Sequence, residues 1–170
     1  PYDYDDRIYR QRIYRGFGHP DPAQPLRYGP NIKDWPEMAP MADNMLLQLT
    51  AVIRDPVTTT DELIPSGETS SYRSNPLRLA EFALSRRVPE YVGRSKEVQQ
   101  KDRQRRQGDV PADLAETLGL VGASAADTSF GSCVFANKPG DGSAREQAAS
   151  CQKVLGGLAN ICYEFATKRY

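Results

Sequence analysis

The sequence contains little histidine and little cysteine, and both shortages exclude kinds of site. His19 is the only histidine, which argues against a Ser-His-Asp triad and against a metal site built from several histidines. The cysteines are Cys133, Cys151 and Cys162, and they lack a Cys-x-x-Cys pair and the spacing of zinc or iron–sulfur ligands. Because each stands among apolar or small residues, we predict buried free thiols and no metal or cofactor bound by this chain alone.

Net charge and long apolar runs are also missing. Lys and Arg together number 22, as do Asp and Glu, so the formal net charge is zero. This balance gives no support to a nucleic-acid or membrane-surface role. No apolar stretch is long enough to span a bilayer, and no segment resembles a secretory signal. We therefore expect a cytoplasmic protein with no nucleic-acid or membrane partner.

The 170 residues are enough for one domain with its own core. Prolines recur in the first forty residues and forbid long regular elements there. We predict an extended arm over residues 1–40, laid against a domain formed by residues 41–170. Within the arm, residues 8–15 fit either a strand or a short helix, and Trp35 is expected to pin the arm by burying its ring. Because the chain begins with Pro1 rather than Met, we expect it to be a piece of a longer protein.

Strand and helix patterns alternate after the arm, which is typical of the α/β class. We predict strands at residues 46–54, 132–136 and 159–163, and helices beginning at Asn75, at Pro111 and near Ser143. The first strand and first helix are expected to bury one face each, made of Leu47, Leu49, Ala51 and Ile53, and of Leu79, Ala80, Ala83 and Leu84. The helix at Pro111 should stop at Gly119, and the charged residues 94–106 should form a solvated helix face or a mobile excursion.

Residues 139–157 are the stretch around which the rest is organised. Gly140 and Gly142 allow a sharp turn in which the backbone approaches a ligand closely. Ser143 is a good helix N-cap, and Glu146 three residues later completes a capping box. The predicted helix runs for about three turns to a glycine stop.

Arg145 falls in the first turn of this helix, where a cation opposes the helix dipole. Such a departure from local stability is expected where an anion binds to the free N–H groups of a helix N-terminus. An ordinary capped helix with Arg145 pointing to solvent fits the same residues. The polar loop at residues 64–75 is longer than a simple connection in a compact domain usually is. We therefore expect it to contain functional residues.

Three segments together resemble one family. Residues 142–149, followed by Leu155-Gly156-Gly157, are similar to the swivelling-domain motif of aconitases. Thr59-Thr60-Asp61 resembles the motif that opens that domain's contribution to the active site, and Arg73 stands where the family places a substrate-binding arginine. The resemblance covers roughly residues 30–170 and is closest to the bacterial hydratase branch. It implies a swivelling β/β/α-type domain, with a mixed, barrel-like sheet flanked by helices, that continues past the last residue.

The resemblance also implies a function. Aconitases are hydro-lyases that act on a tricarboxylic acid with a [4Fe–4S] cluster, and the cluster belongs to other domains of the parent chain. Carried over residue by residue, the resemblance makes Ser143 the base, Arg145 and Arg73 the clamps on substrate carboxylates, and Asp61 and Thr60 hydrogen-bond partners around the site. The expected partners are therefore a small carboxylate substrate and the cluster-binding domains, and the isolated piece should be inactive.

One substitution and two alternatives stay open. Ala144 occupies a substrate-binding position where the family's Gly-Ser-Ser-Arg run has its second serine, so the substrate could be another hydroxy acid. A non-catalytic module that binds carboxylate or phosphate at the helix N-terminus explains the same features. A separate small subunit, as in isopropylmalate isomerases, is disfavoured because the expected Asn-x-Asp-Thr-Asp run is missing at residues 58–62.

Overall fold

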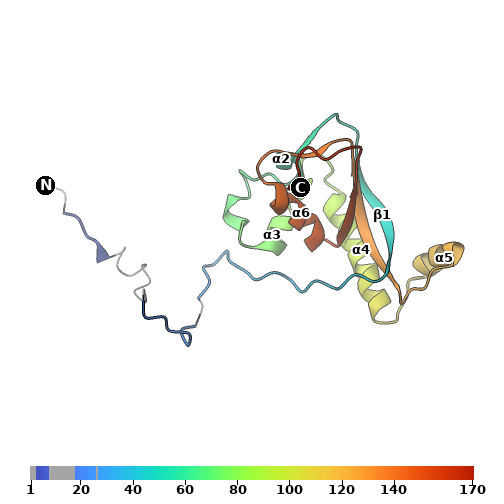
Figure 1. The fold of residues 1–170 in the computed structure, drawn as a ribbon, viewed down its shortest axis with the longest axis horizontal. Coiled ribbons are helices and arrows are strands. Elements are labelled where there is room, and N and C mark those ends of the chain that lie inside the picture. The colour runs from blue at the N-terminus through green and yellow to red at the C-terminus, as the bar shows by residue number, and fades with distance from the viewer. Residues whose placement is uncertain (1–2, 8–17, 26) are drawn as a thin grey trace.

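The computed structural model describes residues 3–7, 18–25 and 27–170 (Figure 1). The strand or helix predicted at residues 8–15 lies outside this described part. The arm from residue 27 onward has no regular element before the first strand, as expected, and the Lys33 N–H donates to the Ser74 carbonyl at 2.8 Å. The prediction for Trp35 was wrong, because 60% of that residue is exposed.

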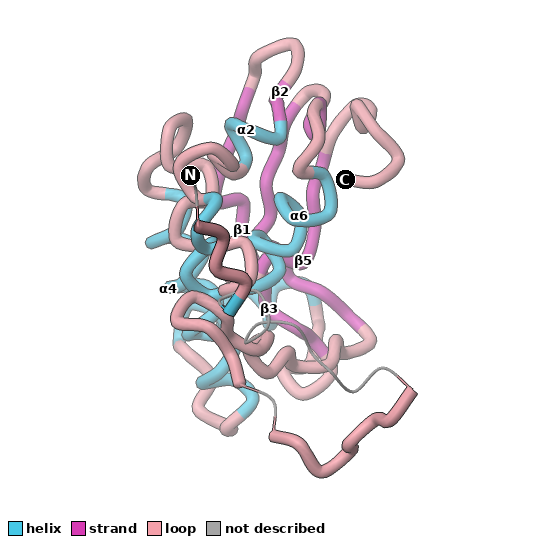
Figure 2. The backbone as a smooth tube through the Cα atoms, turned by 90° about the vertical axis from the view of Figure 1, so that its left-hand side faces the viewer, coloured by secondary structure: helices cyan, strands magenta, loops and turns pink. Residues whose placement is uncertain are grey.

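The central sheet has three parallel strands, β1 (Asn44–Ile53), β3 (Thr128–Ala136) and β5 (Gly157–Ile161), in the order β1-β3-β5. A separate parallel pair, β2 (Thr58–Thr59) with β4 (Pro139–Asp141), lies beyond the carboxyl ends of β1 and β3 (Figure 2). The α/β class is confirmed. The mixed, barrel-like sheet is not found, because every strand pair in the described residues is parallel and no barrel closes there.

Helices make the connections that parallel strands require. They are α2 (Thr60–Leu63), the 3-10 turn η1 (Ser70–Tyr72), α3 (Pro76–Ala80), α4 (Tyr91–Arg106), α5 (Ala112–Val121) and α6 (Arg145–Val154). Helix α4 packs on β1 and β3, α3 packs on α6, and α4 and α6 cover the same side of the sheet (Figure 1). Helix α5 stands at one end of the sheet (Figure 1), where Leu114 and Leu118 form a second buried cluster with Val98 of α4 and Phe130 of β3.

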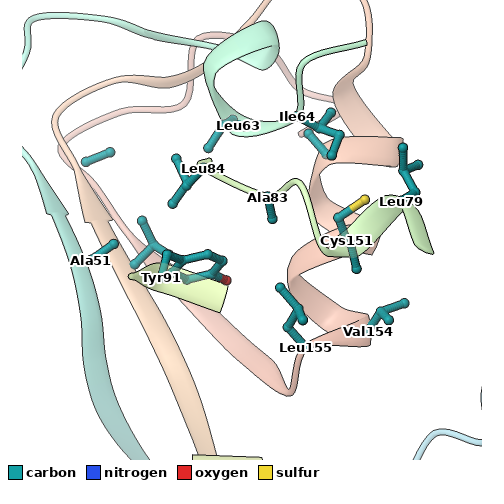
Figure 3. Packing of buried hydrophobic residues seen from close by; sticks show 14 of the residues in the cluster. Ala51, Leu63, Ile64, Leu79, Ala83, Leu84, Tyr91, Cys151, Val154 and Leu155 are labelled. Carbon is teal, nitrogen blue, oxygen red and sulfur yellow. The ribbon is translucent and has the colours of Figure 1, made fainter. Parts of the chain in front are cut away.

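The core forms where α3, α4 and α6 meet the sheet (Figure 3). Its buried side chains include the predicted face after Asn75, with Leu79, Ala80, Ala83 and Leu84 each at most 3% exposed. Asn75 caps α3 by accepting from the Arg78 N–H at 3.1 Å, and Pro76 fills the first position, as predicted. Cys133 and Cys151 are buried as expected, whereas Cys162 is only half-buried.

Two local predictions were wrong, and a third was right in part. The face of β1 changes at a bulge between Leu49 and Ala51, so Thr50 is buried and Leu49 is 51% exposed. The charged segment is the helix that was one of its two predicted forms, with much of its charged face exposed, but α4 also buries Tyr91, Ser95, Val98 and Arg105. Helix α5 continues through Gly119 and ends at Gly122, whose φ of 67° gives the left-handed conformation that closes a helix.

Candidate functional site

The β2–β4 pair brings two distant segments of the sequence together. Thr58 pairs with Pro139 and Thr59 with Asp141, and the Thr58 N–H donates to the Lys138 carbonyl at 3.0 Å. The turn that carries Thr59-Thr60-Asp61 therefore lies beside the glycine turn that leads into α6 (Figure 2). This corner is at the carboxyl edge of a parallel sheet, where α/β proteins commonly bind ligands.

Thr60 makes the closest contact between the two turns. It is 3% exposed, and its Oγ1 lies 3.4 Å from the backbone nitrogen of Ala144. Gly142 has a φ of 131°, and a Cβ there would clash with Thr60 Oγ1. The site thus needs glycine at this position both for its backbone angle and for its close approach.

The capping box is present in this corner, but not where the sequence predicted it. Thr59 caps α2: the Glu62 N–H donates to Thr59 Oγ1 at 3.2 Å, and Glu62 Oε2 accepts from the Thr59 N–H at 2.7 Å. Ser143 is exposed and caps nothing, because α6 begins at Arg145 with Ala144 as an N-cap that makes no side-chain bond.

Glu146 is held elsewhere, which explains why the predicted Ser143–Glu146 box does not form. Its carboxylate accepts from Arg169 Nη2 at 2.9 Å, and this bond holds the pKa of Glu146 below its usual range. The first turn of α6 is therefore left without a side-chain cap. Its free N–H groups can donate to an acceptor from outside, such as a carboxylate.

Arg145 is positioned over the glycine turn. Its Nε donates to the Gly142 carbonyl at 2.8 Å, and no carboxylate of the described residues forms an ion pair with its guanidinium. Arg73 is exposed and lies beside the first turn of α6, where its backbone carbonyl accepts from Gln147 Nε2 at 3.3 Å. Both arginines border α6, and no ion pair joins either guanidinium to a carboxylate of the described residues, although the charge of Arg145 helps to lower the pKa of the neighbouring Glu146.

Asp61 is engaged by one residue of the polar loop and by one residue that follows α3. It forms an ion pair with Arg86 at 2.9 Å and accepts from the Ser66 N–H at 3.2 Å. Both partners anchor the polar loop that carries Arg73. In this structure Asp61 supports the loop, while Thr60, Ala144 and Arg145 face the glycine turn.

The last residues of the chain also contact the glycine turn and form hydrogen bonds to it. The Ala166 N–H donates to the Pro139 carbonyl at 2.9 Å, and Thr167 Oγ1 donates to the Gly140 carbonyl at 3.2 Å. Tyr170 packs against Gly140, where a Cβ would meet its ring. Sequence reasoning missed these residues, as well as Gln147 and Arg86, because no local pattern links them to the glycine turn.

The thiols of this chain do not fit iron–sulfur ligation. Cys133 and Cys151 are each 2% exposed, and burial raises the pKa of Cys151 to about 12, which disfavours the thiolate that a metal needs. Among the described residues, no three or more His, Cys, Asp and Glu side chains gather as a metal site would require.

Comparisons with known proteins add no identification. No family model, no curated protein and no solved structure matches this chain. In the described part of the chain, no helix has the length and apolar character needed to cross a membrane.

Proposed function

We propose that this chain is the swivelling domain of an aconitase-like hydro-lyase, and that it supplies the substrate-carboxylate contacts and the base to a site shared with other domains of a longer parent. The observation that carries the proposal is the β2–β4 pairing. It joins the Thr59-Thr60-Asp61 turn to the glycine turn before Arg145, two of the segments on which the family resemblance depends. The third segment lies nearby, since the backbone carbonyl of Arg73 accepts a hydrogen bond from Gln147 Nε2 on α6.

The proposed substrate is a tricarboxylic acid or a related hydroxy acid. Guanidinium groups bind carboxylates through paired N–H donors, and Arg145 and Arg73 both have their charge available in the described structure. The uncapped N–H groups of α6 add donors and the positive end of a helix dipole. Ala144 offers no hydroxyl beside them, which we expect to alter the choice of hydroxy acid.

Ser143 is the proposed base that removes a proton from substrate carbon. A serine hydroxyl is a weak base at neutral pH unless its alkoxide is stabilised by nearby N–H groups and positive charge. Ser143 is exposed next to the first turn of α6 and is not used as a cap, so its oxygen is available for substrate. The [4Fe–4S] cluster that the resemblance implies would belong to the partner domains, and we assign it no residue here.

The first test is citrate binding to the 170-residue chain, followed by NMR of its backbone amides. We expect saturable shifts at residues 142–147 and a loss of affinity of at least tenfold in Arg145→Gln, because each charge-assisted hydrogen bond is strong. Arg103→Gln is the matched control, since Arg103 lies on the exposed side of α4 and bonds only to Gln99 within that helix. Equal affinity in both variants would contradict the carboxylate site.

The second test separates the enzyme from a non-catalytic carboxylate- or phosphate-binding module at the same helix N-terminus. In the full parent with its cluster reconstituted, Ser143→Ala should lower aconitate hydration by about 10²–10⁴-fold while citrate still binds to the chain. Ser150→Ala is the control, because its hydroxyl only donates to the Glu146 carbonyl within α6. Full turnover in Ser143→Ala, with citrate binding intact, would favour the binding module.

A further inference from the structure

A cavity lies at the opposite end of α6 from Ser143. Its volume is about 240 Å³, and it is bordered by the start of α4, by β3 and β5, and by the last turns of α6. The polar residues that line it are Tyr91, Ser132, Gln152, Lys153, Asn160 and Tyr170. A cavity needs only about 10–15 Å³ to hold one water molecule, so this space can take a small organic molecule.

Three polar groups at this cavity are buried without a well-formed hydrogen bond. Tyr91 and Ser132 are 0% exposed and Gln152 is 6% exposed, and the Tyr91 hydroxyl, Ser132 Oγ and Gln152 Nε2 make no hydrogen bond of good geometry to the described residues. The Ser95 and Ser132 hydroxyls lie close enough to the Tyr91 hydroxyl to offset part of the rise in its pKa. Gln152 Nε2 has no such neighbour in the described part of the chain. Figure 3 shows the Tyr91 ring extending from α4, with its hydroxyl at the end directed toward α6. A buried polar group without a partner costs about 1–3 kcal/mol, so three at one cavity call for an explanation.

The neighbouring contacts fix how these groups are oriented. Gln152 Oε1 accepts from Asn160 Nδ2 at 2.9 Å and from the Tyr170 hydroxyl at 3.0 Å, which leaves the Gln152 NH₂ group as a free donor. Burial raises the pKa of Tyr91 to about 12, so its hydroxyl keeps its proton at neutral pH and can donate. The cavity therefore offers an excess of donors.

Charge favours the same kind of ligand. Lys153 is the only charged side chain among the described residues that line the cavity, and it is half-buried at its edge. The last carbonyls of α6 are already occupied, because the Leu155 N–H donates to the Cys151 and Gln152 carbonyls and the Gly156 N–H to the Lys153 carbonyl. A ligand with acceptor oxygens and a negative charge matches what remains.

We propose that this cavity binds a small monocarboxylate through Tyr91, Ser132, Gln152 and Lys153. The site is separate from the corner of Ser143 and Arg145, and it does not depend on the proposed hydratase function. Its carboxylate would accept from the three uncharged donors and face the Lys153 ammonium group, while Ala149, Val134 and Phe165 provide apolar contacts for a short carbon chain.

The experiment is an NMR titration of the 170-residue chain with sodium acetate and sodium propionate, with sodium chloride at equal ionic strength as the reference. We expect saturable amide shifts at residues 152–160 with both carboxylates and none with chloride. Tyr91→Phe should weaken binding about tenfold, because it deletes one donor and keeps the ring. Tyr72→Phe is the matched control, since Tyr72 is half-buried and stacks on Phe82 elsewhere in the molecule.

Each outcome decides the proposal. Equal affinity in Tyr91→Phe and Tyr72→Phe would overturn it, as would shifts that fail to saturate, which mean that the cavity holds water only. Shifts confined to residues 142–147 would also overturn it, and would instead locate carboxylate binding at Arg145. If Tyr91→Phe lowers the melting temperature markedly, Ser132→Ala replaces it, with the same tenfold loss expected.

Discussion

The two ends of α6 differ in how they present polar groups. At the first turn, Ser143 and Arg145 are accessible and the N–H groups lack a side-chain cap. At the last turn, Gln152 is buried, and its free amide nitrogen faces a cavity that it shares with Tyr91 and Ser132. One end is an open corner with Arg145 in the first turn, and the other is a partly open cavity with Lys153 at its edge.

This difference shows what a local motif can and cannot reveal. The open corner is built from one continuous glycine-rich segment, residues 139–157. Its helix, its turn and Arg145 can therefore be recognised from the sequence. The cavity brings together Tyr91 from α4, Ser132 from β3 and Gln152 from α6. No spacing in the sequence connects these three residues. A search restricted to motifs finds the first site only.

The largest expected effect tests whether the open corner depends on glycine. Gly142→Ala should lower the free energy of unfolding by about 3 kcal/mol, because the new Cβ adopts an unfavourable φ and meets Thr60 Oγ1. Urea denaturation measures the change. In the control Gly119→Ala, the added methyl meets nothing within 4 Å inside α5 and should raise stability by about 0.5–1 kcal/mol. Equal effects of both substitutions would show that the turn is not constrained.

A smaller effect on the free energy of unfolding tests whether the Cys151 thiol of α6 is buried. The folded pKa of Cys151 is about 12, above the value of about 8.5 for an unfolded thiol. The unfolded chain therefore loses its proton first, and stability should fall as the pH rises from about 8.5 toward 12. We expect Cys151 to contribute a loss of about 2–3 kcal/mol between pH 7.5 and 10.5 in urea denaturation, because pH 10.5 lies about two pH units above the unfolded pKa.

Two cysteine variants identify the group responsible for this alkaline loss. Cys151→Ala should remove most of the decrease between the two pH values, whatever its own stability at pH 7.5. Cys162→Ala should keep most of it, because Cys162 is only half-buried. An unchanged pH dependence in Cys151→Ala would show that this thiol is solvated.

The smallest expected effect compares two hydroxyls in the open corner. Thr59→Ala should cost about 1 kcal/mol, because it removes the cap of α2 and half of its capping box. Ser143→Ala should change stability by less than about 0.5 kcal/mol, since Ser143 caps nothing. Thermal melting of both variants measures the difference; a larger loss in Ser143→Ala than in Thr59→Ala would restore the capping assignment made from the sequence.

The sequence predicted what short-range chemistry determines. The Asn75-Pro76 helix start and the apolar face that follows it depend on neighbours within two turns, and both are present. The α/β class followed from the alternation of apolar periods. The glycine turn before α6 was also visible, since positive φ angles at Gly140 and Gly142 require glycine.

Tertiary contacts explain what the sequence did not predict. Helix α4 has almost no apolar periodicity, yet it packs on the sheet by burying Tyr91 and Val98. Asp102 adds a link to the sheet by accepting from the Phe130 N–H at 2.9 Å. The Ser143 cap was wrong because Glu146 is held by Arg169, 23 positions further along the chain. In both places a distant partner outweighs the local pattern.

The parallel connections have a consequence for the speed of folding. Thr60 and Ala144 are 84 positions apart in the chain, and the pairing of β1 with β3 spans nearly the same separation. Contacts this distant form only after a costly loop closure, and topologies rich in them fold slowly. We therefore expect refolding in the millisecond-to-second range, with the corner around Arg145 acquiring its native geometry after the local helices have formed.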